Sequence, residues 1–115
     1  MVVSIEIRQL FWKRKITLRF DIYSWLLMCE MNEIEFHEIS KLPGEVLMNT
    51  LIYSAYVSNQ RYNAKKLRYD PIEFEQVWKQ VKHSDVKRIV EAIETSKIFG
   101  KTTEQWAALA AEKKK

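Results

Sequence analysis

Glycine and proline are scarce in this sequence, with two of each among 115 residues. Tight turns and flexible linkers depend on these two residue types, so their scarcity argues against a fold of many short strands and against a linker between two domains. Helices joined by modest connections fit this composition better. The length is typical of one domain.

Residues that commonly build catalytic or metal sites are also few. Cys29 is the only cysteine, which excludes an intramolecular disulfide, and its place on an apolar helix face predicts a small buried side chain. His37 and His83 have no nearby serine, cysteine or carboxylate pattern that suggests a catalytic partner. An acidic run lacks the spacing of a calcium loop and reads as a solvated face: Glu30, Glu33, Glu35 and Glu38. We therefore expect no enzyme activity, no cofactor and no metal.

Long apolar runs are missing as well. None approaches the roughly 20 residues that span a membrane, and the N-terminus lacks the layout of a signal peptide, so we expect a cytoplasmic protein without a membrane partner. Three of the 19 Lys and Arg residues form the tail 113–115, which leaves 16 basic and 15 acidic residues in 1–112. Such a balance argues against binding nucleic acid by charge alone.

Two segments near the N-terminus alternate between apolar and polar residues, which places one set of side chains on each face of a strand. Their apolar members are Val3, Ile5 and Ile7 in the first segment and Ile16, Leu18 and Phe20 in the second. We expect a half-buried β-hairpin over residues 3–20, with its turn at Lys13-Arg14-Lys15. Since an isolated hairpin is only marginally stable in water, its apolar face should pack on helices.

From Asp21 onward the apolar residues follow helical spacing. Asp21 is a strong N-cap for a helix that ends near Met31, and one face of this helix carries Ile22, Trp25, Leu26 and Cys29. A short helix or turn is expected over residues 34–39. Pro43 suits the first position of the next helix. Nine of the twelve residues 46–57 are apolar, which predicts a central buried helix, followed by a frayed end and a loop over 58–69.

The strongest local signal is Asp70-Pro71-Ile72-Glu73, which combines an N-cap, a proline at the first helical position and a capping-box glutamate. A further helix begins at Ser84, Gly100 can end it, and a last short helix covers 104–112. The apolar faces of the first two are Phe74, Val77, Trp78 and Val81, then Val86, Ile89, Val90 and Ile93. Gly100-Lys101-Thr102 lacks the second glycine of a phosphate-binding loop.

These elements predict a mainly α (α+β) single domain over residues 1–112, with a charged tail at 113–115. The hairpin at 3–20 should pack on a bundle of about five helices in 21–112, around a central buried helix. In chain order the layout resembles the tail assembly chaperones of long-tailed bacteriophages over roughly residues 15–100. The resemblance rests on element order, on Phe74 and Trp78, and on the stretches 15–20, 22–30, 51–56 and 86–96.

The resemblance implies a chaperone that binds and solubilises the helical tape-measure protein and helps to recruit tail-tube subunits. It implies action in the bacterial host cytoplasm and absence from the mature virion. Such chaperones are often also made in a longer frameshifted form, and an A-rich stretch encoding Lys113-Lys114-Lys115 is a hypothesis for the slippery site.

A chaperone for a helical client needs an exposed apolar groove or helix face. Aromatic residues that flank the predicted central helix or lie near the C-terminus are the candidate anchors, expected to be partly exposed: Tyr56, Tyr62, Tyr69, Phe99 and Trp106. Packing in the core is the alternative for each of them. Self-association into a homo-oligomer would cover any exposed apolar patch.

Two other functions stay open. Arg61, Lys65, Lys66 and Arg68 alternate with tyrosines, a pattern able to hold phosphates and stack bases, as a small nucleic-acid-binding regulator would. The other is a structural head–tail connector that is retained in the virion.

Overall fold

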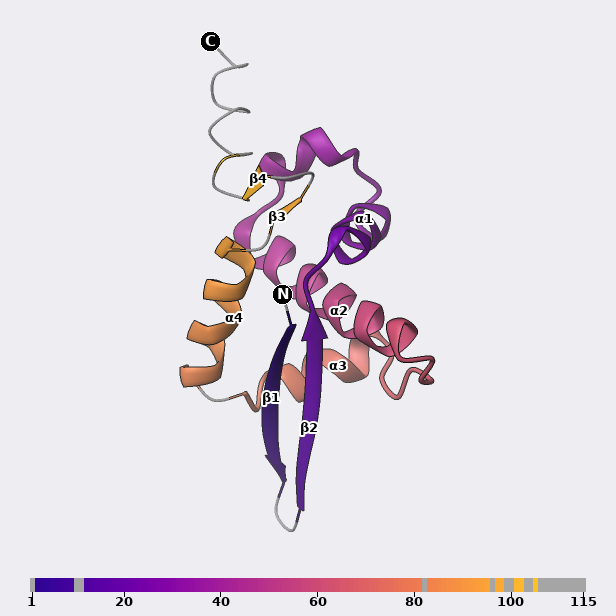
Figure 1. The fold of residues 1–115 in the computed structure, drawn as a ribbon, viewed down its shortest axis with the longest axis vertical. Helices are drawn as coiled ribbons and strands as arrows, with labels where there is room; N and C mark the ends of the chain where they lie inside the picture. The colour runs from indigo at the N-terminus through magenta and orange to yellow at the C-terminus, as the bar shows by residue number, and fades with distance from the viewer. Residues whose placement is uncertain are drawn as a thin grey trace.

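The computed structural model describes residues 2–9, 12–81, 83–95, 97–98, 101–102 and 105. An antiparallel hairpin of β1 (Val2–Gln9) and β2 (Trp12–Arg19) precedes α1 (Ile22–Met31), the 3-10 helix η1 (Phe36–Lys41), α2 (Gly44–Tyr62), α3 (Pro71–Trp78) and α4 (His83–Thr95) (Figure 1). The expected fold, a hairpin with about five helices, is therefore confirmed within the described chain. A two-residue pair, β3 (Lys97–Ile98) with β4 (Lys101–Thr102), was not expected from the sequence.

The hairpin is amphipathic, as its alternation predicted. Val3 pairs with Leu18 and Ile5 with Ile16, and all four side chains are buried on one face. On the other face the hydroxyl groups of Ser4 and Thr17 lie 3.1 Å apart.

The prediction of a turn at 13–15 is wrong. Lys13, Arg14 and Lys15 lie within β2 and pair with residues 8, 7 and 6 of β1. Strand pairing joins backbone groups, so the ladder runs on past the last apolar pair into a charged stretch.

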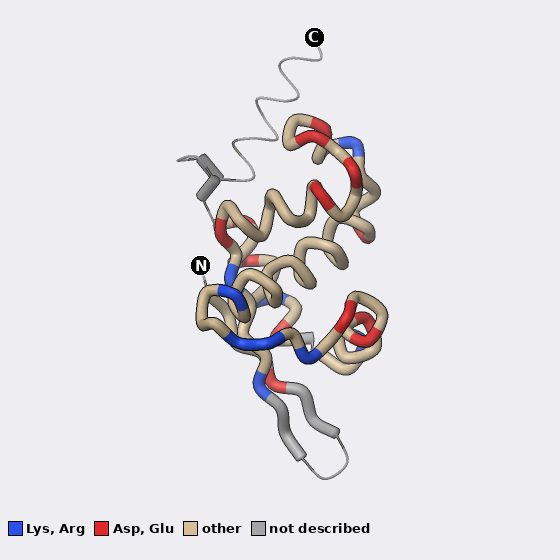
Figure 2. Tube along the Cα trace, turned by 90° about the vertical axis from the view of Figure 1, so that its right-hand side faces the viewer, with Lys and Arg blue, Asp and Glu red and all other residues tan. Residues whose placement is uncertain are grey.

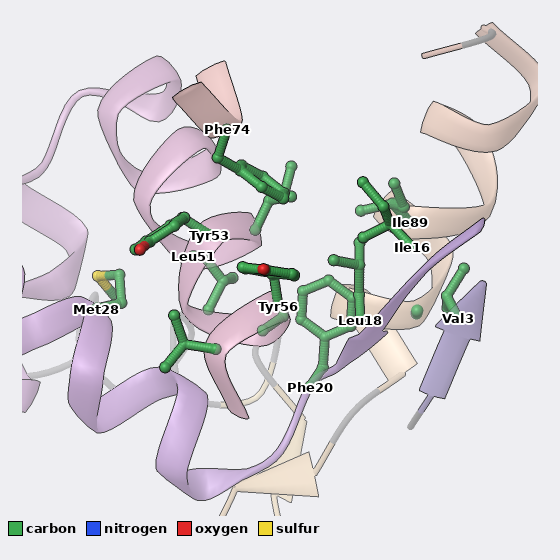
Figure 3. Close-up of a cluster of buried hydrophobic side chains, with 14 of the residues drawn as sticks. Val3, Ile16, Leu18, Phe20, Met28, Leu51, Tyr53, Tyr56, Phe74 and Ile89 are labelled. Carbon is green, nitrogen blue, oxygen red and sulfur yellow. The ribbon is translucent and has the colours of Figure 1, made fainter. Parts of the chain in front are cut away.

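The core lies between the apolar face of the hairpin and the helices. β2 packs on α2 and β1 on α4, so these two helices cover the sheet from the same side. Ile89 of α4 lies beside Ile16 of β2, and Phe20 lies beside Tyr56 of α2 (Figure 3). The nine residues from Leu51 to Asn59 of α2 are all buried, which confirms α2 as the central helix.

Helix α1 begins where the sequence predicted it but turns a different face to the core. The Asp21 carboxylate accepts the backbone N–H of Ser24 at 2.9 Å, which completes a capping box. The buried residues are Ser24, Trp25, Met28 and Cys29, whereas Leu26, expected on the buried face, is 48% exposed. Ser24 tolerates burial because its hydroxyl donates to the Asp21 carbonyl at 2.7 Å.

Several boundaries also differ from expectation. Pro43 is the N-cap of α2 rather than its first residue, and α2 continues through buried Ser58 and Asn59 to Tyr62. Ser84, predicted as an N-cap, lies inside α4, while the Asp70 capping box of α3 is confirmed. Gly100 and most of the predicted helix 104–112 lie outside the described residues, except for Gln105, which is helical.

Candidate functional site: an apolar groove between α2 and α3

A groove of about 190 Å³ runs between α2 and α3 and reaches the end of α1. We call it the α2–α3 groove; its walls are Met31, Asn49, Thr50, Tyr53, Pro71, Phe74, Glu75 and Trp78. Sites that enclose a drug-sized molecule usually measure about 300–1,000 Å³. The groove is therefore too small for such a ligand but can accept side chains from a partner.

An aromatic cluster forms the floor of the groove. The ring of Phe74 lies 5.4 Å from that of Tyr53, edge to face, and 5.2 Å from that of Tyr56 in a stacked arrangement. The ring of Tyr69 lies 5.8 Å from that of Tyr56. Because each ring contacts others from a different element, the cluster ties α3 and the loop before it to α2.

The polar ends of these rings fix the loop that leads into α3. The Tyr53 hydroxyl donates to the Tyr69 carbonyl at 3.1 Å, and the Tyr56 hydroxyl accepts the N–H of Arg68 at 2.6 Å. Burial, with a smaller contribution from Tyr56, Asp70 and Glu73, raises the pKa of Tyr53 above its ordinary value, so this phenol stays protonated near neutral pH. The groove thus has a preformed floor.

Exposed apolar side chains occur along the elements that form the groove. Met31 on its wall is 36% exposed, Val46 on the first turns of α2 is 39% exposed, and Ile72 on the first turn of α3 is 74% exposed. Apolar area beside an apolar hollow is typical of a surface that binds another protein.

Charges are divided between the two ends of α2 (Figure 2). Acidic residues gather where α1, η1 and the start of α2 meet, namely Glu30, Glu33, Glu35, Glu38 and Glu45. Beyond the other end of α2 the chain is basic, with Arg61, Lys65, Lys66 and Arg68 all exposed. This order suits the helix dipole, which favours anions at its N-terminus and cations at its C-terminus.

The structure adds one strand residue to the basic stretch. The guanidinium of Arg19 in β2 lies 3.5 Å from the ring centre of Tyr62, and Arg61 donates to the hydroxyl of Tyr23. We call Arg19, Arg61, Lys65, Lys66, Arg68 and Tyr62 the basic face.

The aromatic residues predicted as anchors have different fates. The expectation that Tyr56 is partly exposed is wrong, because its ring is only 3% exposed beneath Phe74. Tyr62 is 69% exposed but lies on the basic face, and Tyr69 is half-buried at the core. Phe99 and Trp106 lie outside the described residues.

The residues that do form the groove were assigned by the sequence to helix faces only. Phe74 and Trp78 were placed on the apolar face of α3, and Tyr53 on the central helix. The exposed Ile72, next to the proline in the α3 start signal, was the one available hint of a surface contact.

The residues considered for catalysis do not enter the groove. His37 is exposed on η1, and the side chain of His83 is not among those described. Cys29 is buried, as predicted, and this burial, together with Glu35, raises the pKa of its thiol. Within the described ranges no group of three or more His, Cys, Asp or Glu residues could hold a metal ion, and no helix is both long and apolar enough to cross a membrane.

Comparisons with models of known protein families, with curated proteins and with solved structures found no match for this chain.

Proposed function

We propose that this protein is an assembly chaperone that shelters an amphipathic helix of its client in the α2–α3 groove. Following the resemblance to phage tail assembly chaperones, the client is the tape-measure protein, and the chaperone helps to recruit tail-tube subunits. The observation that carries the proposal is the apolar groove, floored by Tyr53 and Phe74 and accompanied by exposed Met31 and Ile72.

A helix that docks in a groove presents side chains at positions i, i+3, i+4 and i+7. Covering an exposed side chain such as Ile72 with such a helix contributes on the order of 1–2 kcal/mol. Because hydrogen bonds from Tyr53 and Tyr56 already hold the loop before α3, little ordering accompanies binding. The same apolar area left uncovered would favour aggregation, so a client also protects the chaperone.

The direct test is co-expression with fragments of a tape-measure protein. We expect a fragment that is insoluble alone to become soluble with this chain and to copurify with it. The double variant Met31→Glu/Ile72→Glu should lose this effect, since it places two carboxylates in the contact while both positions are solvent-accessible.

Leu26→Glu is the matched control, because Leu26 is also exposed but does not line the groove. Circular dichroism should show that all variants are folded. Fragments that stay equally insoluble with and without the chaperone would count against the proposal, and so would equal rescue by the double variant and the control.

The basic face favours a second candidate, a small nucleic-acid-binding regulator. The observation is that Arg19 joins four exposed cations beside the exposed ring of Tyr62. Such a face predicts binding to single-stranded DNA that weakens steeply with salt and with Lys65→Gln/Lys66→Gln. Unchanged fluorescence anisotropy of a labelled oligonucleotide at low salt would dismiss this candidate.

A further inference from the structure

Charge around the α2–α3 groove points to the kind of helix that it accepts. Glu75 is the only charged residue on its walls, and it is exposed at the surface of α3. Asp70 and Glu73, at the start of the same helix, lie near enough to Tyr53 to contribute to the rise in its pKa. The mouth of the groove along α3 is therefore negative.

The opposite wall extends into the acidic end of the molecule. Glu45 lies one turn before Asn49 on the same side of α2, and Glu30 directly precedes Met31. Both are exposed. Lys79, which follows Trp78, is the cation next to the wall residues on α3. Carboxylates thus outnumber cations on both sides of the apolar floor.

We infer that the α2–α3 groove takes amphipathic helices whose apolar stripe is flanked by Lys or Arg. This inference rests on the proposed function, and it names the charge of the client that the groove accepts. In such a complex the apolar stripe covers Tyr53, Phe74 and Trp78, while the flanking cations lie against Glu75 on one side and Glu45 on the other. Long basic side chains suit this arrangement because their apolar stems can lie along the groove edge.

The whole chain makes the inference easy to separate from nonspecific attraction. Its formal net charge is +4, so long-range electrostatics favour an anionic peptide over a cationic one. A preference for a cationic helix would have to come from the charges beside the groove. The basic face, in turn, would attract the anionic peptide away from the groove.

The test uses fluorescein-labelled model helices of about 18 residues, or five turns. All carry the same leucine stripe, and the flanking positions are all Lys, all Gln or all Glu. Binding to the full chain is measured by fluorescence anisotropy at low salt. We expect the Lys-flanked peptide to bind about fivefold more tightly than the Glu-flanked one, with the ratio shrinking at high salt.

Glu75→Lys should abolish or reverse this ratio. Glu94→Lys, at an exposed position of α4 outside the groove, should leave it unchanged. Equal or tighter binding of the Glu-flanked peptide to the wild-type chain would overturn the inference. If both peptides still bound and both were weakened by Met31→Glu/Ile72→Glu, the proposed function would stand without it. Binding of no peptide at the groove would overturn both.

Discussion

Asp21 joins the first two α-helices, and its removal gives the clearest test of how this fold is held together. One oxygen of its carboxylate accepts the N–H of Ser24 at 2.9 Å and caps α1. The same carboxylate accepts the hydroxyl of Ser58 in α2 at 2.8 and 3.0 Å, across a sequence separation of 37 residues. Asp21→Ala therefore removes a cap and an inter-helix hydrogen bond in one step.

The two parts have different magnitudes. Loss of an N-cap side chain costs about 1 kcal/mol of stability. A hydrogen bond to a charged group contributes about 1.5–3 kcal/mol, although the Ser58 hydroxyl can regain part of this by bonding to a carbonyl of its own helix. We expect Asp21→Ala to lower the free energy of unfolding by about 3 kcal/mol, which corresponds to a fall in Tm of roughly 12 °C.

Asp70 provides a matched control. It caps α3 by accepting the N–H of Glu73 at 2.7 Å but is itself exposed, so Asp70→Ala should lower stability by only about 1 kcal/mol. Urea denaturation followed by far-ultraviolet circular dichroism measures both values. A double-mutant cycle with Ser58→Ala should give a coupling energy of about 1–2 kcal/mol between Asp21 and Ser58.

Equal losses in Asp21→Ala and Asp70→Ala, with a coupling energy near zero, would refute the reasoning. In that case Asp21 would act only as a local cap, and the packing of α1 on α2 would depend on apolar contacts alone.

Three further outcomes are expected. Ala64, just past the end of α2, has a φ of 54°, so Ala64→Gly should raise the free energy of unfolding by about 1 kcal/mol in urea titrations; no change would mean that this residue is unstrained. Tyr56→Phe removes the acceptor of the Arg68 N–H and should cost about 1–2 kcal/mol, with faster hydrogen exchange of that amide as the direct check. Burial raises the pKa of Cys29 and Tyr53 above their ordinary 9.0 and 10.0, so the unfolded chain loses these protons first and stability should fall as pH rises above about 9. Cys29→Ala should make the fall between about pH 9 and 10 shallower, and identical slopes would contradict this account.

Local signals in the sequence predicted the elements well. The alternation around Ile5 and Ile16 specifies a hairpin with one apolar face, because successive side chains of a strand point to opposite sides. Asp70 and Pro71 specify the start of α3 through interactions within a single turn. The scarcity of glycine is also visible in the structure: Glu33 and Ala64 hold the left-handed positions after α1 and α2, where glycine is commonest.

Pairing between distant segments was harder to predict. The helical spacing of α1 fits a buried Leu26, yet Met28 and Ser24 lie in the core because α1 packs on α2 along that side. Tyr56 was expected near the surface, but Phe74 and Tyr69, more than a dozen residues away in sequence, cover its ring.

The sequence alone therefore determined which segments form the hairpin and the helices and where most of them begin, since those choices depend on neighbours within one or two turns. The tertiary structure decided which side of α1 is buried, that Tyr56 belongs to the core, and that Met31, Tyr53 and Trp78 meet at one groove. These outcomes depend on contacts between helices that are separated by tens of residues, and a periodic pattern within one helix carries no information about the partner it will meet.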